Sequence, residues 1–517
     1  MLPDVPPLIA ALMDPSRYPH PVDRVELMQT HGAWVLLAGD RAYKIKKPVA
    51  LPFMDFSTLD KRRTACEAEL RVNSRFAPAD PASRIYLCAQ AITGTPTHPV
   101  IGGDPSQVID WAVQMRRFPE ADRLDHVADR GELTPGMMQA LARHLAGFQA
   151  SAAVAGPDSP WGTPDDVAAF ARDNLASLRL TLTDDTDLRL VDSLSHWTEA
   201  HIGQLTPLLQ QRRTDGRVRE GHGDLHLANL VRMGDEVIPF DAIEFNDALR
   251  WIDVASEIAF LWMDLWRIGQ AGLAHVLLSE WLDASGDVTA PALLPFFAVY
   301  RALVRAKVAG IRWTQLQASS DAATAALQEV RTYLALASHL AGQAPLPPSP
   351  SLIITHGLSG SGKTWASTRW LAAHTGGRAI RLRSDVERKR LHGLAALAAS
   401  GSGLNTGLYS PQAHGDTYAS LLSRSRALLD QGWTVLVDAA FLRQRERQAF
   451  AELATQARCP FHILACEAPP DELRRRIRER QARGGDASEA TLAVLEQQFG
   501  WLEPLTPTER SFVLPLG

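Results

Sequence analysis

The pattern of apolar and polar positions changes character twice along the chain of 517 residues. From 31 to 118, apolar residues form short runs that are typical of strands, interrupted by one helical stretch at 59–76. From about 133 to 340, they recur at three- and four-residue spacing, the period of amphipathic helices. After 350, short apolar runs alternate with helical stretches, and this alternation predicts a parallel sheet covered by helices on both faces.

These runs divide the chain into a small β-rich part, a larger helical part and a final α/β part. The strand-like runs of the first part are residues 33–39, 41–47, 82–92 and 107–118. A β-rich lobe followed by a helix-rich lobe predicts a two-lobed α+β arrangement with a cleft between the lobes. The apolar strand runs of the final part are residues 352–357, 377–385, 433–441 and 460–468.

The clearest boundary is the stretch "GQAPLPPSPS" at 342–351, where clustered prolines favour an extended linker over a helix. The predicted fold class is therefore multidomain. We expect an N-terminal domain at 1–342, with a small lobe at about 20–118 and a helical lobe at about 119–342, then a proline-rich linker at 343–350 and an α/β domain at 351–517.

Composition is that of a globular protein, with 46% hydrophobic and 21% charged residues. No apolar run reaches membrane-spanning length, and the N-terminus lacks the basic region of a secretory signal. The four cysteines are scattered without CxxC spacing, which argues against a disulfide framework or a zinc site and favours a reducing compartment. We therefore expect a cytoplasmic protein that does not associate with membranes.

The formal net charge of −5 is unevenly distributed. From Leu346 onward there are 21 Lys and Arg against 16 Asp and Glu, a balance of +5, which leaves −10 for the preceding part. A basic C-terminal part suits anionic ligands such as nucleotides, but an excess of +5 is too small to predict nucleic-acid binding.

The decisive motif of the final part is "GLSGSGKT" at 357–364, which has the spacing G-x4-G-K-[ST] between a strand and a helix. Backbone N–H groups of such a glycine-rich loop converge on phosphates, and the helix N-terminus adds partial positive charge. Lys363 is expected to reach the β- and γ-phosphates, and Thr364 to bind Mg²⁺. The predicted phosphate-binding residues are Gly357, Ser359, Gly360, Ser361, Gly362, Lys363 and Thr364.

Two carboxylates follow later strands of this part. Asp385, in "RLRSDVERKRL", lies where a base or orienting group would face an acceptor hydroxyl. The same stretch also has the spacing of a helix capping box, with Ser384 as the cap and Glu387 three residues on, and both interpretations can hold together. Asp438 ends the apolar run "WTVLVDAAF", as a Walker B-type aspartate does when it acts on Mg²⁺.

Arginines supply the remaining chemistry of this part. Arg383, Arg388 and Lys389 are candidates to hold the γ-phosphate or an anionic acceptor. The helical run "DELRRRIRERQARGG" places Arg476, Arg480 and Arg483 on or near one face, where they could form a lid over the nucleotide and stabilise charge on the transferred group. The glycine- and serine-rich stretch 397–410 is either a mobile loop over the acceptor or a linker.

Together, "GLSGSGKT", "RSDVERKRL", "VLVDAAF" and "RRRIRER" resemble the small P-loop kinases that include gluconate kinases, zeta-toxin kinases and phage polynucleotide 5′-kinases. The resemblance covers roughly residues 350–510. It implies ATP with Mg²⁺ as the donor and a hydroxyl group as the acceptor, whose type varies widely among these kinases.

A second set of polar residues lies in the helical part. "GHGDLHLANL" at 221–230 contains His222, Asp224 and Asn229 in the spacing H-x-D-x-x-x-x-N, and Asp241 ends the next strand-like run. Phosphoryl transfer in the protein-kinase fold uses an aspartate that accepts the hydroxyl proton, and an asparagine and an aspartate that hold Mg²⁺. The β-rich part precedes this set, in the order that the fold requires.

The sequence of this loop, with a second histidine at 226, resembles the catalytic loop of aminoglycoside phosphotransferases and related small-molecule kinases. The resemblance implies that Asp224 is the base and that Asn229 and Asp241 are metal ligands. We expect His222 to brace the loop and Asp253 to stabilise the helical lobe.

The same fold needs a strand lysine paired with a helix glutamate. "RAYKIKK" offers Lys44 and Lys46 on one strand face, and "CEAEL" offers Glu67 and Glu69. We prefer Lys44 with Glu67, leave Lys46 and Glu69 open, and expect at least one of the lysines to lie on a solvated edge strand. The run "VQMRRF" around Met115 resembles the hinge that contacts adenine.

Two features depart from this resemblance. "LLAGDR" supplies only Gly39 for the phosphate loop, as in aminoglycoside kinases, where this loop is not strictly glycine-rich. The helical lobe shows no strongly acidic patch for the amines of an aminoglycoside, so antibiotic resistance is not implied.

The full order of the two domains resembles a bacterial fusion family of predicted kinases and ATP-binding proteins. We therefore predict a bifunctional enzyme, dependent on ATP and Mg²⁺, that phosphorylates hydroxyl groups of small molecules such as sugars, nucleosides or aminoglycoside-like compounds. One alternative is that the C-terminal domain is a polynucleotide 5′-kinase, although it lacks interleaved aromatic and basic residues for stacking single strands. The other is that one domain is a non-catalytic ATP-dependent switch. The sequence predicts neither the acceptors nor the oligomeric state.

Overall fold

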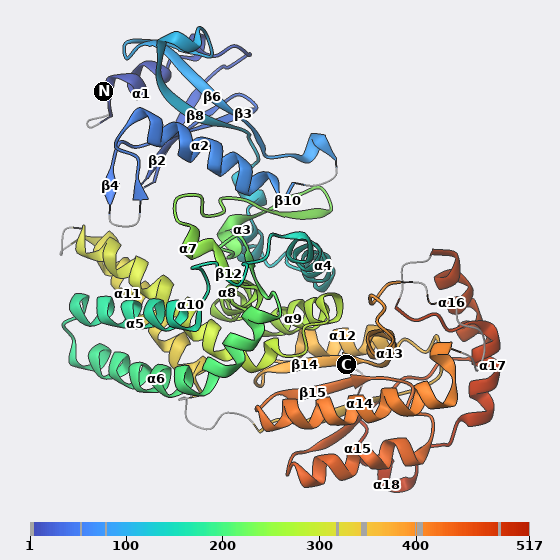
Figure 1. Cartoon of the computed structure of the whole chain (residues 1–517). Coiled ribbons are helices and arrows are strands. Elements are labelled where there is room, and N and C mark those ends of the chain that lie inside the picture. Colours follow the sequence, from blue (N-terminus) through green and yellow to red (C-terminus); the bar gives the residue numbers. More distant parts are fainter. Residues whose placement is uncertain are drawn as a thin grey trace. The chain divides into compact units, whose positions relative to one another are not determined.

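The computed structural model describes residues 5–30, 32–51, 54–77, 80–316, 320–342, 349–398, 400, 407–483 and 487–515 (Figure 1). Contacts between residues divide the chain into two compact units. The first consists of Met1–Leu133, Ser151–Ala171 and Ile202–Leu261, and the second of Thr134–Ala150, Arg172–His201 and Trp262–Gly517. Each is described by itself below. The expected linker at 343–350 lies mostly outside the described residues, so the predicted domain boundary stays a prediction.

The first unit begins with a six-stranded antiparallel sheet. Its strands, in spatial order, are β1 (Val25–Gln29), β2 (Ala33–Ala38), β3 (Arg41–Lys46), β8 (Val108–Arg116), β6 (Tyr86–Thr95) and β7 (His98–Ile101). The four strand-like runs predicted from the sequence form β2, β3, β6 and β8. The two remaining strands were not predicted, and both are short and lie at the edges of the sheet, where exposed polar residues weaken the apolar pattern.

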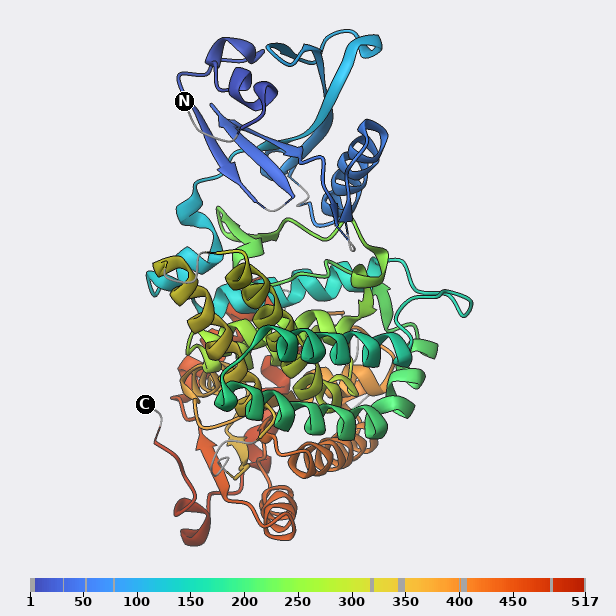
Figure 2. The same cartoon turned by 90° about the vertical axis from the view of Figure 1, so that its left-hand side faces the viewer.

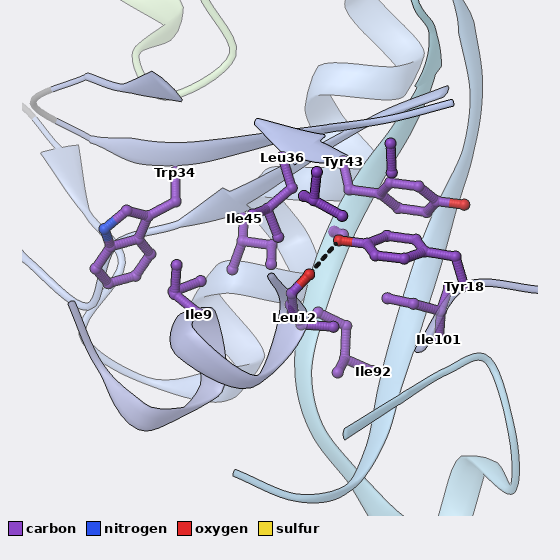
Figure 3. Packing of buried hydrophobic residues seen from close by; sticks show 12 residues of the cluster. Ile9, Leu12, Tyr18, Trp34, Leu36, Tyr43, Ile45, Ile92 and Ile101 are labelled. Atoms are coloured by element: carbon purple, nitrogen blue, oxygen red, sulfur yellow. Dashed lines mark hydrogen bonds between the residues drawn. The ribbon is translucent and has the colours of Figure 1, made fainter. Parts of the chain in front are cut away.

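Successive side chains along each strand point to opposite faces of this sheet, and both faces are buried. On one face, side chains from β2 and β3 pack against helix α1 (Pro7–Leu12), and the hydroxyl of Tyr18 donates to the carbonyl of Leu12 at 2.8 Å (Figure 3). The labelled members of this cluster are Ile9, Leu12, Tyr18, Trp34, Leu36, Tyr43, Ile45, Ile92 and Ile101. Because Tyr43 and Ile45 point into this cluster, the lysines that alternate with them on β3 must point to the opposite face.

The opposite face is covered by helix α2 (Leu59–Ser74), so that α1 and α2 lie on the two sides of the sheet (Figure 2). The helix starts at Thr58, whose side chain accepts from the backbone N–H of Lys61 at 3.3 Å. Its buried residues include Cys66, Glu69 and Val72, which are spaced three apart and so share one helix face. A glutamate among them brings a carboxylate into the interior.

Short strands follow in the region that the sequence pattern gave as mainly helical. They form two antiparallel pairs, β9 (Val218–Glu220) with β12 (Trp251–Asp253), and β10 (Leu230–Met233) with β11 (Glu236–Pro239). Strands of three or four residues are too short to show an alternating pattern. The remaining elements of the first unit are β4 (Ala50–Leu51), β5 (Met54–Asp55), α3 (Leu124–Asp129) and α7 (Asp247–Arg250).

Helices dominate the chain from 135 to 340, as the apolar periodicity predicts. They are α4 (Pro135–Ser151), α5 (Pro164–Thr181), α6 (Asp185–Thr214), α8 (Val254–Arg267), α9 (Ala271–Ser285), α10 (Ala290–Thr314) and α11 (Asp321–Leu340). Asp253 lies directly before α8 and accepts from buried Arg212 of α6 at 2.8 and 2.7 Å. This pair joins α6 to the end of β12, and Asp253 also accepts from the N–H of Ala255 at the start of α8, so it stabilises this part of the chain as expected. None of the helices in the described residues is long and apolar enough to span a membrane.

The last part of the second unit is a four-stranded parallel sheet in the order β14 (Ala379–Arg383), β15 (Thr434–Asp438), β13 (Leu352–His356) and β16 (Phe461–Ala465), which confirms the predicted α/β fold. Helix α12 (Lys363–Ala373) lies on one face, and α14 (Pro411–Asp430) and α15 (Gln444–Gln456) lie on the other (Figure 1). The other helices are α13 (Ser384–Leu391), α16 (Pro470–Arg483), α17 (Leu492–Trp501) and α18 (Pro507–Arg510). The carboxyl ends of the parallel strands meet at one edge, where ligands bind in such sheets.

We expect the Asp253–Arg212 pair to stabilise the first unit strongly. Asp253→Asn keeps the size of the side chain but leaves a buried guanidinium without its carboxylate, which should lower the free energy of unfolding by about 3–5 kcal/mol. Glu67→Gln is the control, because Glu67 pairs with Arg63 at 2.9 Å on the exposed face of α2 and should contribute less than about 0.5 kcal/mol. Urea denaturation followed by tryptophan fluorescence measures both, and equal effects would contradict the prediction.

Candidate active sites

The first site is organised by a buried carboxylate between two lysines. Nζ of Lys44 lies 2.8 Å from Oε1 of Glu69, and Nζ of Lys46 contacts Oε2 of the same carboxylate. The Glu69 side chain is fully buried, and those of Lys44 and Lys46 are 13% and 2% exposed. Glu69 therefore ties helix α2 to strand β3 through both lysines at once.

The preferred pairing of Lys44 with Glu67 is wrong. Glu67 is about half exposed and pairs with Arg63, one turn earlier on the same helix. It lies two residues from Glu69 and so points away from the sheet. Because both lysines are buried, the expectation that one of them lies on a solvated edge is wrong as well.

Asp241 is brought to the same lysine from a distant part of the sequence. Its Oδ1 lies 2.5 Å from Nζ of Lys44, and its φ of 61° lies in a region that non-glycine residues rarely adopt. The backbone there is held by the hydroxyl of Tyr86, which accepts from the Asp241 N–H at 3.0 Å, and by Asn73, which accepts from the Ala242 N–H at 2.8 Å. This strained conformation, fixed by β6 and α2, points the carboxylate at Lys44.

The loop after β9 carries the remaining predicted residues. Nε2 of His222 lies 2.8 Å from the carbonyl of Phe240, and its Nδ1 accepts from the Asp224 N–H at 3.3 Å. The ring therefore donates at Nε2 and is neutral, and burial lowers its pKa. His222 thus braces the loop, as expected. The amide of Asn229 donates to the carbonyl and to Oδ2 of Asp224 at 2.9 and 3.1 Å, which joins two predicted functional residues.

Electrostatic attraction outweighs burial in this cluster. Burial alone would lower the pKa of Lys44, but the carboxylates of Asp241 and Glu69 raise it well above its usual value. Burial alone would raise the pKa of Asp241, but Lys44 lowers it below its usual value. Both groups are therefore charged at neutral pH, as phosphate binding and metal binding require.

Glu244 is a further charged residue of this cluster that the motifs do not include. It contacts Nζ of Lys46, its side chain is 5% exposed, and burial raises its pKa. Its only signal in the sequence is a carboxylate inside the apolar run "DAIEF", three residues after Asp241. Met115, expected at an adenine hinge, pairs with Ala42 and Tyr86 across the sheet and is partly buried, and its nucleotide contact stays a prediction.

The donor atoms of this site fit Mg²⁺. Asp224, Asn229 and Asp241 supply carboxylate and amide oxygens, the hard ligands that Mg²⁺ prefers. Within the described residues, no group of three or more His, Cys, Asp and Glu side chains is arranged to hold a metal ion by itself. Mg²⁺ in kinases needs no such group, because it is held by one or two carboxylates together with phosphates and water.

The second site is built on the loop between β13 and α12. Gly357, Gly360 and Gly362 have φ of 150°, 83° and 93°, and a Cβ on Gly357 would lie 2.2 Å from the carbonyl oxygen of Cys466. Only glycine fits this close approach to the loop after β16. Lys363 folds back over the loop, where its Nζ donates to the carbonyls of Gly357 and Leu358 at 3.0 and 2.8 Å. Burial lowers the pKa of Lys363.

A cavity of about 430 Å³ opens above this loop and brings most of the predicted residues together. The predicted residues that line it are Ser359, Gly360, Gly362, Lys363, Thr364, Arg383, Asp385, Arg388, Asp438, Arg476 and Arg480. Gly357 and Ser361 do not line it, since the loop turns them toward the protein interior. One cavity thus holds phosphate-binding groups, two carboxylates and two lid arginines.

Asp438 lies at the carboxyl end of β15 with 5% of its side chain exposed. Its Oδ2 accepts from the hydroxyl of Ser367 at 3.3 Å and lies 4.0 Å from Nε of Arg383. Asp438 and the hydroxyl of Thr364 both line the cavity, and their hard oxygen atoms fit Mg²⁺.

Asp385 lies at the start of α13, opposite the loop. Its Oδ1 accepts from Nη1 of Arg388 at 2.7 Å. Burial alone would raise the pKa of Asp385, but Arg388 and Arg383 lower it, so the carboxylate is ionised at neutral pH. The alternative of a capping box is wrong, because the cap is Arg383 and no side chain caps the helix. Glu387 instead pairs with Arg390 and Arg424.

The expected basic residues differ in their placement. Arg476 donates to the carbonyl of Gly360 at 3.3 Å, and Arg480 donates to that of Ala490 at 2.8 Å, so both lie beside the cavity. Arg483 does not line it. Lys389 pairs with Glu489 at 3.1 Å and does not line the cavity, so the structure does not place it where it could hold the γ-phosphate or an anionic acceptor. Much of the stretch 397–410, expected as a loop over the acceptor, lies outside the described residues.

Several residues of the cavity carry no motif signal. Gln498 of α17 accepts from the Ser359 N–H at 2.8 Å and so fixes the phosphate loop from the C-terminal end of the chain. His414 and Glu446 form a pair at 2.9 Å near Tyr418, and all three residues line the cavity. These residues come from three helices, α14, α15 and α17, which only the fold brings together.

Comparisons with known proteins agree with this architecture. The profile of an AAA domain family, AAA_33, matches residues 352–505. Uncharacterized proteins of Mycobacterium tuberculosis and Mycobacterium bovis are each 30% identical over 506 residues, which cover 95% of this chain and 95% of the relative. The chain belongs to their family.

The chain can also be compared with solved structures. A putative aminoglycoside phosphotransferase from Ralstonia eutropha is 16% identical, with a TM-score of 0.38 over 66% of this chain and 98% of that chain. A choline/ethanolamine kinase family protein from Mesorhizobium loti is 13% identical, with a TM-score of 0.36 over 62% and 94%. A sugar kinase from Janibacter is 22% identical, with a TM-score of 0.25 over 33% and 86%. The chain thus joins an α+β part to an α/β part that carries the P-loop.

We expect Glu69, and not Glu67, to support nucleotide binding at the first site. Glu69→Gln removes the charge that holds Lys44 and Lys46, and should weaken ATP binding by about tenfold or more. Glu67→Gln is the matched control on the same helix and should change binding by less than about twofold. Calorimetric titration with ATP and Mg²⁺ measures both, in a Lys363→Ala background that silences the second site. Equal affinities for the two variants would contradict the assignment.

Proposed function

We propose that the protein is a bifunctional phosphotransferase that transfers the γ-phosphoryl group of ATP to hydroxyl groups at two separate sites. The observation that carries the proposal is that each site holds three groups together: a lysine for phosphates, an oxygen set that fits Mg²⁺, and a further aspartate. In the first site these are Lys44, Asn229 with Asp241, and Asp224. In the second they are Lys363, Thr364 with Asp438, and Asp385.

At the first site, Lys44 would bind phosphate oxygens while Glu69 keeps its side chain in place. Asp224 would accept the proton of the acceptor hydroxyl, and its position is fixed by the amide of Asn229 and the backbone contact to His222. When bound, Mg²⁺ would neutralise the negative charge that develops on the transferred group. Asn229 and Asp241 would hold it through their oxygens.

At the second site, backbone N–H groups of the loop and the N-terminus of α12 would bind the phosphates. Lys363 would move from the loop carbonyls to the β- and γ-phosphates, while Arg476 and Arg480 stabilise charge from the lid. Asp385, ionised through Arg388 and Arg383, would orient the acceptor hydroxyl or accept its proton. Asp438 and Thr364 would hold Mg²⁺.

We further propose that both acceptors are small hydroxylated molecules and that the protein acts in the cytoplasm. The second cavity is also lined by His414, Tyr418 and Glu446, polar side chains that suit hydrogen bonds to hydroxyl groups. A single-stranded nucleic acid would need stacked aromatic residues along a basic groove. Trp365, Tyr409, Tyr418 and Trp501 line this cavity together with several arginines, so a polynucleotide 5′-kinase stays the alternative for the second site.

If both sites are catalytic, Lys363→Ala and Asp224→Asn should each abolish one of two separable ATP-consuming activities. Loss of the general base at the first site should lower its turnover by about 10²- to 10⁴-fold, while the second activity stays intact. The measurement is a screen of sugars, nucleosides and aminoglycosides with ATP and Mg²⁺, in which mass spectrometry detects the phosphorylated product.

The outcomes separate the proposal from its alternatives. Loss of all turnover in either single variant would contradict two independent sites. A site that binds ATP without any acceptor-dependent turnover would be a regulatory switch. Phosphorylation of an oligonucleotide 5′ end that Lys363→Ala abolishes would replace the small-molecule acceptor of the second site.

A further inference from the structure

Helix α9 precedes the P-loop part in the sequence by almost 70 residues, yet it packs directly on it within the second unit. A Cβ on Gly272 would lie 1.9 Å from the carbonyl oxygen of Ala372 at the end of α12, so only glycine allows this approach. Further along α9, the hydroxyl of Ser279 accepts from the backbone N–H of Arg381 at 3.0 Å. Since β14 is the edge strand of the parallel sheet, α9 covers its open edge.

One face of α9 presents two buried carboxylates to the arginines of β14. Nη2 of Arg381 lies 3.3 Å from Oε2 of Glu280 and 3.5 Å from Oδ2 of Asp283. Nη1 of Arg383 lies 3.9 Å from Oδ2 of Asp283. The side chains of these four residues are between 2% and 12% exposed. Asp283 is thus the one of the two that faces both arginines.

Arg383 connects this pair to the second site. Its Nε lies 4.0 Å from Oδ2 of Asp438, so the guanidinium stands between Asp283 on α9 and the carboxylate expected to hold Mg²⁺. Arg383 and Asp438 line the cavity above the P-loop, whereas Asp283 lines a separate cavity of about 250 Å³ on the other side of Arg383. Asp283 therefore reaches the site only through Arg383.

The position of the arginine has an electrostatic consequence. A buried guanidinium requires a negative partner, and whichever carboxylate supplies it loses attraction for other cations. Burial raises the pKa of Asp283 to about 6, while Arg381 and Arg383 oppose the shift, so the carboxylate is largely ionised above neutral pH. Asp385 also attracts Arg383, but Asp283 contributes the largest attraction. With Asp283 as a partner, Arg383 is neutralised less by Asp438, and the charge of Asp438 stays available for Mg²⁺.

We propose that Asp283 is a positioning residue of the P-loop site, which holds and neutralises Arg383 so that Asp438 stays available to Mg²⁺. Helix α9 then carries a residue that the proposed P-loop phosphotransferase needs, although the helix precedes the proline-rich stretch in the sequence. The inference rests on the proposed function in one respect, because it takes Asp438 as a metal ligand.

The test is the Mg²⁺ dependence of ATP binding in the full-length chain, measured by calorimetry in a Lys44→Ala background that silences the first site. Asp283→Asn should raise the half-saturating Mg²⁺ concentration about tenfold, while ATP affinity without metal changes by less than about twofold. Asp283→Glu restores the charge and should return the value to within about threefold of the unmodified chain.

Glu280→Gln is the matched control. Glu280 lies on the same face of α9 and pairs with Arg143 at 2.6 Å and with Arg381. Among the described residues it forms no ion pair with Arg383, and it attracts Arg383 less than Asp283 does. Both substitutions should lower the melting temperature, since both remove a buried charge partner, but only Asp283→Asn should shift the Mg²⁺ dependence. A similar shift in both would mean that the effect is structural and would overturn the inference.

A double variant keeps the inference testable if Asp283→Asn alone folds poorly. In an Arg383→Gln chain there is no guanidinium to compete for Asp438, so adding Asp283→Asn should leave the Mg²⁺ dependence unchanged within about twofold. A further tenfold shift in the double variant would show that Asp283 does not act through Arg383. The ATP binding that remains in the Lys44→Ala chain should be lost when Lys363→Ala is added, and if it is not, the proposed function of the second site fails. If instead Asp283→Asn leaves the Mg²⁺ dependence unchanged, only the present inference is overturned.

Discussion

The structure depends on the requirement that a charge removed from water must meet an opposite charge. In the first site Glu69 satisfies two lysines with one carboxylate, and Asp241 adds a second negative group to Lys44. The charges of Glu69, Lys44 and Lys46 are costly to bury alone, so β3 and α2 are held together. Asp241, which is 46% exposed, joins the loop after β11 to them through Lys44. The same arrangement is what a phosphate and a metal need, so stability and chemistry are joined in the same contacts.

The second site meets the requirement differently. We expect its loop to bind anions through backbone N–H groups, and Lys363 contacts loop carbonyls rather than a carboxylate. The carboxylates of this site instead face arginines, Asp385 with Arg388 and Asp438 with Arg383. Of these two contacts, the one between Asp438 and Arg383 is long, at 4.0 Å, and Arg383 also faces Asp283. A long contact favours a carboxylate that we expect to bind a metal ion, because a short ion pair would have to be broken before the ligand can bind.

Local motifs could be predicted from the sequence because each depends on residues close together in the chain. The phosphate loop, the loop with Asp224 and Asn229, and the strand end at Asp438 follow from spacing and from the strand before each of them. The partner of Lys44 did not follow from the motif, since "CEAEL" offers two glutamates and α2 has few apolar residues to indicate its buried face. The signal was present in the spacing of Cys66, Glu69 and Val72, but Glu69 counts as polar in any hydrophobic pattern.

Contacts between segments that are distant in the sequence could not be predicted from local motifs. Glu280 and Asp283 lie on a helix whose buried residues are mostly apolar, and no motif marks them as partners of a strand 100 residues later. The same holds for Gln498, which fixes the phosphate loop from a helix near the end of the chain. A P-loop usually opens a domain, and here it follows two-thirds of the sequence. The packing of α9 on β14 gives that order a physical reason, because the edge strand that carries Arg381 and Arg383 is covered by a helix that comes before the loop.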